Sequence, residues 1–308
     1  MQIESLKIFC DVIETQSFSK AASLNYISQS AVSQQIRGLE EKYDRKLIER
    51  GKRSLAPTLA GSVLYQGAKD MLERFRLVES RLHVLTNAIA GSLRVATIYS
   101  VGLHELPPYV KEFLRRYPSA NIHLEYGRAN KIYEDVSANT VDLGIVAYPV
   151  RRSGLDVLPF REDQLVVITH PDHPLARHRR IEMRKLARQR FVAFERDVPT
   201  RRATDRMLRR AGVPVDVVME FDNVETIKRA VEINAGIAIV PALTVESESQ
   251  SGALRAIEFS RGGIARPLGI VIRRGRERTQ VMDRFVALLQ GKDGPLVSPD
   301  EEWEAKES

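Results

Sequence analysis

Residues 17 to 42 constrain the fold more than any other stretch, because they predict two short helices joined by a tight turn. Ser28 is a good N-cap for the second helix, since a serine oxygen can accept a backbone N–H of the first turn. The apolar residues of that helix recur at helical spacing and are expected to form one buried stripe: Val32, Ile36, Leu39 and Tyr43. The opposite face is then left free for a partner.

That free face carries hydroxyls, amides and an arginine, with no carboxylate that would repel phosphate. Gln34 can pair bidentately with adenine and Arg37 with guanine, each contact being worth ~1–3 kcal/mol of discrimination. Ser30 and Ser33 fit phosphate or water-mediated contacts, which set register. The stretch therefore predicts a helix that enters a DNA major groove; the alternative is a surface helical hairpin whose polar face is merely solvated. The predicted DNA contacts on this helix are Ser28, Gln29, Ser30, Ser33, Gln34 and Arg37.

Two earlier helices are expected to complete a small core. Residues 3 to 15 place apolar side chains at helical spacing, and the next helix carries Ala21 and Ala22, small residues that let two backbones approach closely. Phe18 and Leu24 are expected to fill the space beside them.

Two short apolar pieces follow within residues 45 to 57, on either side of a turn rich in glycine and positive charge, as in a two-stranded wing. A charge run is usually a solvated face. Because this one directly follows a reading helix, Arg50 and Arg53 are predicted to contact phosphate or the minor groove.

These residues resemble the LysR-type transcriptional regulators, whose N-terminal part is a winged helix-turn-helix. The departures are Asn25 where leucine is usual, Tyr43-Asp44 where Leu-Gly is usual, and Ile48 where phenylalanine is common. They alter packing more than the reading face, but the base preference cannot be carried over. The matching positions are Phe9, Val12, Ser17, Phe18, Ala21, Ala22, residues 28–33, Ile36, Leu39, Glu40, Arg50, Thr58, Ala60 and Gly61.

A long helix is predicted from Thr58 to Ala90, spanning roughly 50 Å. Its apolar residues alternate spacings of four and three, which makes a narrow heptad seam. A helix of this length cannot bury its seam in a small wing domain, so we expect it to pair with its copy; a core helix of a larger fold is the alternative. The resemblance implies the same linker and a homodimer or homotetramer. The seam comprises Leu64, Ala68, Met71, Phe75, Val78, Leu82, Leu85 and Ile89, and all but Ala68 and Ile89 are predicted dimerisation residues.

The second half alternates strand and helix patterns, which argues for α/β units around central sheets. Roughly 200 residues of such alternation suggest two lobes rather than one core. The resemblance, carried here by Asp142-Leu143-Gly144-Ile145 and Gly236 to Pro241 among others, implies a periplasmic-binding-protein-like effector domain with a small ligand between its lobes. The predicted fold class is thus α/β with an N-terminal winged helix-turn-helix, a long linker helix and a two-lobed effector domain. The predicted divisions are 1–57, 58–90, 91–292 (lobe I 91–161 and 267–292, lobe II 162–266) and an acidic, disordered tail 293–308.

Ligands in such lobes sit at the carboxyl ends of strands and at helix N-termini. Five residues occupy such places and are the candidate effector contacts, although each could equally be a cap or turn residue. The available arginines and helix ends favour an anionic metabolite. These candidates are Ser100, Arg128, Tyr148, Thr200 and Asn223.

The net charge of +7 suits a partner made of phosphates. Residues 1–60 carry only +2 of it, whereas residues 177–210 hold thirteen Lys/Arg and four Asp/Glu, a net of +9. We expect most of that segment to be a solvated helix face; a subunit contact or a polyanion patch is the alternative.

Several classes of protein are disfavoured. No signal peptide, membrane span, cofactor motif or catalytic signature is recognisable, so we expect a cytoplasmic protein that is not an enzyme. Cys10 is expected to pack rather than react, and His170, His173 and His178 fall in a proline-rich turn, which argues against a metal site. A ligand-responsive LysR-type regulator is favoured over an architectural DNA-binding protein whose second half only assembles subunits. An enzyme or transport-type binding protein with an added N-terminal domain is the remaining alternative.

Overall fold

A computed structural model describes residues 2–50, 55–84, 89–260 and 263–292. The chain divides into two compact units, residues 1–87 and 88–308, and each is treated by itself. The predicted acidic tail, Arg53 and Leu85 lie outside the described residues, as does the side chain of Arg50.

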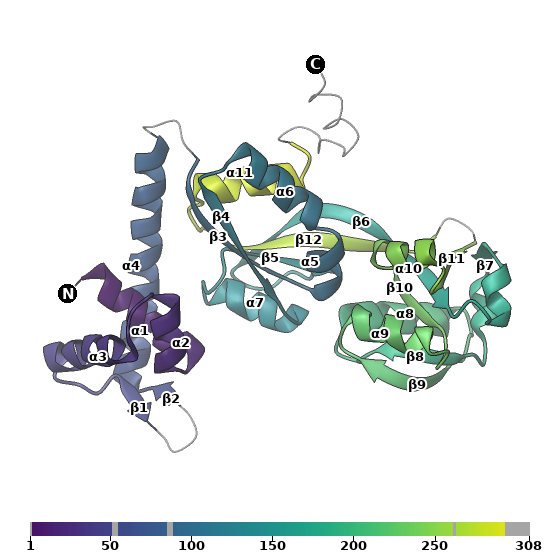
Figure 1. The fold of residues 1–308 in the computed structure, drawn as a ribbon, viewed down its shortest axis with the longest axis horizontal. Coiled ribbons are helices and arrows are strands. Elements are labelled where there is room, and N and C mark those ends of the chain that lie inside the picture. The colour runs from purple at the N-terminus through teal and green to yellow at the C-terminus, as the bar shows by residue number, and fades with distance from the viewer. Residues whose placement is uncertain (1, 51–54, 85–88, 261–262, 293–308) are drawn as a thin grey trace. The chain divides into compact units, whose positions relative to one another are not determined.

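Three short helices, a two-stranded wing and the long helix α4 build the first unit (Figure 1). The wing strands pair antiparallel, with Glu49 opposite Ala56. The elements are α1 (Ile3–Thr15), α2 (Phe18–Leu24), α3 (Gln29–Tyr43), β1 (Ile48–Arg50), β2 (Leu55–Pro57) and α4 (Leu59–Val84).

The core of this unit lies where α1, α2 and α3 meet. Val32, Ile36 and Leu39 are buried there, together with Ala21 and Ala22. Two predicted core residues are wrong. Tyr43 and Leu24 are 40% and 54% exposed, because each ends its helix beyond the core cluster.

The start of α4 is fixed by its Thr-x-Ala-Gly sequence. Thr58 Oγ1 donates to the Lys46 carbonyl at 2.7 Å and accepts the Gly61 N–H at 2.9 Å. A Cβ at Gly61 would lie 2.0 Å from the Leu47 carbonyl oxygen, so only glycine allows this close approach. The helix is thereby attached directly to the chain that enters the wing.

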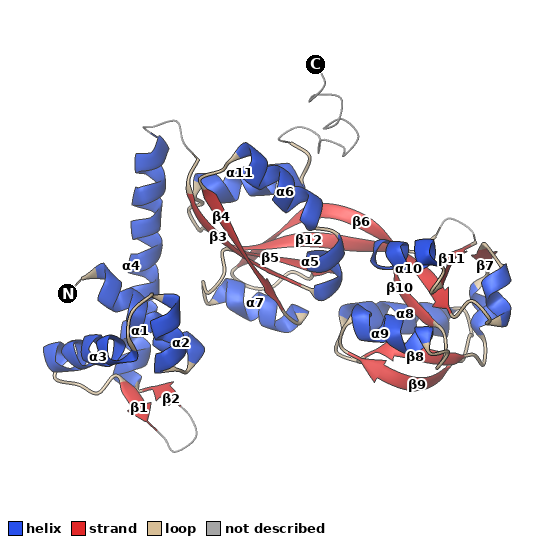
Figure 2. Cartoon of the chain, viewed as in Figure 1, coloured by secondary structure: helices blue, strands red, loops and turns tan. Residues whose placement is uncertain are grey.

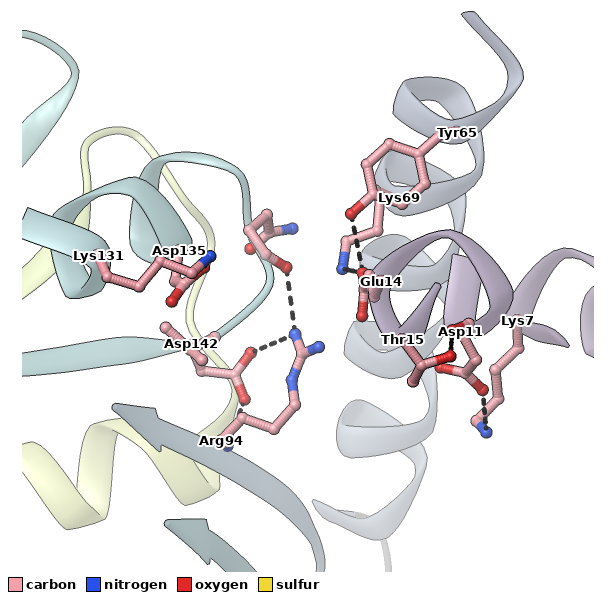
Figure 3. A network of polar contacts seen from close by, with 12 residues as sticks. Lys7, Asp11, Glu14, Thr15, Tyr65, Lys69, Arg94, Lys131, Asp135 and Asp142 are labelled. Carbon is pink, nitrogen blue, oxygen red and sulfur yellow. Dashed lines mark hydrogen bonds and ion pairs between the residues drawn. The ribbon is translucent and has the colours of Figure 1, made fainter. Parts of the chain in front are cut away.

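A polar brace joins α4 to α1 one turn further along (Figure 3). Glu14 accepts hydrogen bonds from Lys69 Nζ at 2.5 Å and from the Tyr65 hydroxyl at 2.9 Å. Lys69 is almost fully buried, so this carboxylate is its necessary charge partner.

The predicted seam of α4 divides into two parts. Leu64 and Ala68 pack against α1 within the same chain. Further along, Met71, Phe75, Val78 and Leu82 are 42–59% exposed. The predicted helix end at Ala90 is wrong. Ile89 and Ala90 are not helical, and Ile89 instead packs against the core of the second unit, which removes it from the seam.

Lobe I of the second unit is a five-stranded sheet in the order β4-β3-β5-β12-β6, covered by helices on both faces (Figure 2). Strand β3 runs parallel to β4 and β5, whereas β12 is antiparallel to β5 and β6. Phe113 of α6 meets Phe285 of α11 on one face, and Ile132 of α7 belongs to a separate core cluster. The elements are β3 (Gly91–Thr97), α5 (Tyr99–His104), α6 (Pro107–Arg116), β4 (Ala120–Tyr126), α7 (Ala129–Ser137), β5 (Leu143–Ala147), β6 (Leu155–Thr169), β12 (Ala265–Arg273) and α11 (Gln280–Leu289).

The Asp-Leu-Gly sequence at the start of β5 links this strand to β3. Asp142 accepts the Arg94 backbone N–H at 2.7 Å and pairs with the Arg94 guanidinium at 3.3 Å (Figure 3). A Cβ at Gly144 would lie 2.4 Å from the Ile132 side chain, which explains the glycine beneath α7.

Lobe II continues from the far half of β6, to which β10 and β11 pair antiparallel. A second pair of strands, β8 and β9, is parallel, and Phe191 of β8 bridges to Ile237 beside β10. The elements are β7 (Arg180–Ile181), β8 (Arg190–Phe194), α8 (Pro199–Arg210), β9 (Asp216–Phe221), α9 (Val224–Glu232), β10 (Ala238–Pro241), α10 (Glu246–Ser251), β11 (Arg255–Phe259) and the short 3-10 turns η1 (Pro174–Arg177), η2 (Met183–Leu186) and η3 (Ala242–Val245).

Two strands, β6 and β12, pass between the lobes and are hydrogen-bonded to each other. Within β6, Phe160 belongs to a lobe I core and Leu165 to a lobe II core. The ladder is irregular between Pro267 and Gly269 of β12, close to this change of lobe. The predicted fold class is confirmed: an N-terminal winged helix-turn-helix, a long helix and a two-lobed α/β domain.

Candidate DNA interface and effector cleft

The N-terminus of α3 is organised by Ser28, as predicted. Its backbone is extended, and its Oγ accepts the Ala31 N–H at 3.1 Å while lying 2.8 Å from the Ser30 hydroxyl. An N-cap of this kind fixes where the helix starts and therefore which residues face outwards.

The outward face of α3 is polar along its first three turns. Gln29, Ser30, Gln34 and Arg37 are exposed, and Ser33 is half-buried. Since the helix is held by its opposite stripe, these side chains are presented on a rigid support.

Glu40 links α3 to the wing. It accepts the Leu47 N–H at 3.0 Å and pairs with Lys46 at 2.8 Å. Desolvation alone would raise its pKa, but the hydrogen bonds from Lys46, Leu47 and Ile48 together lower the pKa of Glu40 below its usual value. These contacts attach α3 to the chain that enters the wing.

A cleft opens between the lobes of the second unit, with a cavity volume of about 50 Å³. Four of the five candidate effector residues line it: Ser100, Arg128, Thr200 and Asn223. Ligand pockets usually measure about 300–1,000 Å³, so this cavity is small by comparison.

Three helices of eight or more residues begin at this cleft: α7, α8 and α9. The N-cap positions of α7 and α8 are Arg128 and Val198, and neither makes a side-chain cap hydrogen bond. In α9, by contrast, Asn223 Oδ1 caps the Thr226 N–H at 3.0 Å. Two helix ends thus present first-turn N–H groups that no capping side chain covers, an arrangement that suits an anion.

Arg128 joins the lobes. From lobe I, its guanidinium reaches Glu195 at 2.8 Å, Asp197 at 3.0 Å and Asp222 at 3.5 Å, all in lobe II. These carboxylates compete with any anionic ligand for the same arginine.

The sequence prediction missed Arg266, a lining residue that is only 1% exposed. Its guanidinium donates to Ser100 Oγ at 2.7 Å and to Asp163 at 3.0 Å, while its Nε has no hydrogen-bond partner among the described residues. Burial raises the pKa of Asp163, and Arg266 opposes that rise. The arginine precedes a proline within a strand, and no sequence pattern marked it as a cleft residue.

Tyr148 does not line the cleft. Its backbone is left-handed (φ 50°), its N–H donates to the Pro267 carbonyl at 2.8 Å, and its ring packs against the lobe I core. Burial raises the pKa of the Tyr148 hydroxyl, and the charges of the cleft arginine Arg266 and of Arg206 oppose that rise.

The histidine turn of lobe II is structural. His170 Nδ1 and His173 Nδ1 accept backbone N–H groups of Asp172 and Leu175, each at 3.2 Å. Across the described ranges there is no cluster of three His, Cys, Asp or Glu side chains that could hold a metal ion. None of the helices described is both long and apolar enough to cross a bilayer.

Models of two protein families match the chain. Residues 3–62 match the bacterial regulatory helix-turn-helix protein, lysR family, and residues 86–293 match the LysR substrate binding domain. The chain belongs to the LysR family. It is therefore a DNA-binding transcriptional regulator with an effector domain, and not an enzyme.

Individual relatives agree with the LysR assignment. A "Probable RuBisCO transcriptional regulator" of Cyanidioschyzon merolae is 30% identical over 272 residues, covering 86% of this chain and 90% of the relative. A full-length OxyR variant from Pseudomonas aeruginosa shares the fold with a TM-score of 0.71 at 21% identity, covering 95% and 94% of the two chains. The Synechocystis CcmR regulatory domain, solved in complex with 2-PG, is 27% identical with a TM-score of 0.61, covering 68% of this chain and all of that one.

Proposed function

We propose that this LysR-type regulator reads its operator with the outward face of α3, pairs through the exposed part of α4, and responds to a small anionic molecule held between the lobes. The observation that carries the effector part is the convergence of α7, α8 and α9 on one cleft together with Arg128 and Arg266. Because its target is chromosomal DNA, we place its action in the cytoplasm.

Base reading is assigned to Gln34 and Arg37. Both are exposed on the face opposite Val32 and Ile36, with side chains able to make bidentate contacts in the major groove. The serines of the same helix, with Arg50 and Arg53 of the wing, are assigned to phosphate contacts that set the register.

The test of base reading is binding to duplex DNA from the region upstream of the protein's own gene. Gln34→Ala and Arg37→Ala should each weaken specific binding by about 1–3 kcal/mol and reduce the preference for this duplex over unrelated duplex. Lys42→Ala, in the last turn of α3, is the matched control and should bind like wild type. Wild-type affinity in both variants would remove base reading from this helix.

Pairing is assigned to Met71, Phe75, Val78 and Leu82. These side chains follow one seam beyond the part that α1 covers, and a row of exposed apolar residues at heptad spacing suits a second copy of the same helix. Leu64 is withdrawn from this set in favour of packing on α1.

An anionic effector is supported by the uncapped ends of α7 and α8 and by two arginines at the cleft. The complex of the CcmR domain with 2-PG supports the choice of this domain as the ligand site. A panel of small carboxylates and phosphates should contain at least one compound that raises the melting temperature, since a ligand at a hundred times its Kd stabilises by about 2.7 kcal/mol.

The effector variant is Arg128→Gln, and its matched control is Arg151→Gln, an exposed arginine of lobe I outside the cleft lining. The shift should be lost in the first and kept in the second. A panel in which no anion stabilises the protein, or a shift that survives Arg128→Gln unchanged, contradicts the assignment.

A further inference from the structure

Lobe II carries a basic surface that neither operator reading nor the cleft uses. Residues 177–210 have a net charge of +9. Because the whole chain is at +7, all other residues together carry a net −2, so the basic character of the protein comes entirely from this segment. We define the basic surface by six exposed residues: Lys185, Arg188, Arg202, Arg206, Arg209 and Arg210.

Four of these cations lie on one face of α8. Arg202, Arg206, Arg209 and Arg210 follow helical spacing, while Ala203 and Leu208 turn inward and are buried. Like charges four residues apart repel each other and destabilise a helix. A face with this cost is explained most simply by an anion that binds there.

The other two cations come from the segment before β8. The Arg188 N–H donates to the Pro214 carbonyl at 2.7 Å, four residues after the end of α8, and Leu186 shares a buried cluster with Leu208. The two segments therefore meet over the same core, and Arg188 lies beside the loop that follows α8.

These six cations have no ion pair among the described residues, whereas neighbouring arginines do. Arg180 pairs with Glu258 at 2.9 Å, Arg184 with Glu182 at 2.5 Å, and the buried Arg201 with Asp205 at 2.8 Å. Lobe II thus neutralises some of its arginines internally and leaves this group to solvent.

We propose that the basic surface binds the phosphate backbone of duplex DNA outside the segment read by α3. All but one of the cations are arginines, whose planar fork suits bidentate pairing with phosphate. Phosphate contact needs no base-specific groups, and duplex DNA is already the partner of this regulator. The effector domain then acts as a second, sequence-independent DNA contact.

The test compares full-length proteins on two duplexes, one limited to the operator and one extended on both sides by several helical turns. The triple variant Arg202→Gln, Arg209→Gln, Arg210→Gln removes three cations from the surface. The matched control, Lys111→Gln, Arg151→Gln, Lys292→Gln, removes the same charge from exposed positions of lobe I.

On the extended duplex, the triple variant should flatten the dependence of log affinity on log salt by about 0.9 for each lost phosphate contact. On the short duplex it should match wild type, and the control should match wild type on both. Circular dichroism melting verifies folding, and Lys185→Gln, Arg188→Gln tests the same surface from its other segment.

Three results would overturn the proposal. They are an unchanged salt slope on the extended duplex, an equal loss on both duplexes, and dissociation of the oligomer in the triple variant, which would make the surface a subunit contact.

Discussion

Replacing Arg266 by methionine should destabilise the effector domain strongly. The arginine is 1% exposed and its partner Asp163 is 9% exposed, so the change leaves a carboxylate in the interior without its cation. Breaking a buried pair in this way costs about 3–5 kcal/mol of unfolding free energy. Methionine approximates the aliphatic part of the side chain, which keeps the packing loss small.

The deficit should depend on pH in a defined direction. Burial raises the pKa of Asp163 and of Glu105 in the wild-type domain. A folded-state pKa above the unfolded value means that folding favours the protonated carboxyl, so these groups reduce stability as the pH rises through that pKa. Without Arg266 the pKa of Asp163 rises further, and the deficit should shrink as the pH falls from neutrality.

The assay is urea denaturation of the full chain followed by far-ultraviolet circular dichroism, since the only tryptophan, Trp303, lies outside the described residues. The double variant Arg266→Met, Asp163→Asn should recover most of the loss. Arg274→Met is the matched control: its ion pair with Asp156 is exposed, so it should cost at most about 1 kcal/mol. A deficit as small as the control's, or one that grows with acidification, would refute the reasoning.

Three further outcomes are expected. Hydrogen bonds from Arg115 and Arg116 outweigh desolvation and lower the pKa of Glu112 to about 2, so its carboxylate stabilises the fold fully above its ordinary pKa of 4.5 and loses that effect as the pH falls towards 2. In denaturant titrations, Glu112→Gln should therefore be less stable than wild type at neutral pH and converge with it in that acid window. Phe75→Glu, in the exposed seam of α4, should shift the assembly towards monomer in sedimentation velocity, with Glu79→Gln as the control. Ser28→Ala removes the α3 cap and should lower the unfolding free energy of the DNA-binding unit by about 1 kcal/mol in thermal melts, whereas Ser23→Ala should not.

Local patterns sufficed for the helices with clear ends. The bounds of α1 and the start of α3 were predictable to the residue, because a helical period marks the first and the Ser28 cap marks the second. Strand β6 shows where this fails. Residues 161–164 are charged or polar and interrupt its apolar run, so a local pattern does not reveal one continuous strand. These four residues are polar because they lie where the strand passes from one lobe to the other.

The cleft was only partly predictable for a related reason. Strand ends and helix starts converge by topology, which is why Ser100, Arg128, Thr200 and Asn223 could be named in advance. Arg266 could not, because its partners Asp163 and Ser100 stand 103 and 166 residues away in the chain. Contacts between residues so far apart in the chain cannot be predicted from the pattern of a short stretch of sequence.

The paired crossing strands limit what motion the effector domain can perform. Strands β6 and β12 pair along eight residue pairs. Sliding one lobe past the other along the strands would therefore break many of the hydrogen bonds between them at once. A bend or torsion concentrated at the irregularity between Pro267 and Gly269 would leave most rungs intact. Ligand entry should therefore change the angle between the two lobes slightly, about a single axis. The DNA-bound assembly would receive a rotation rather than a translation.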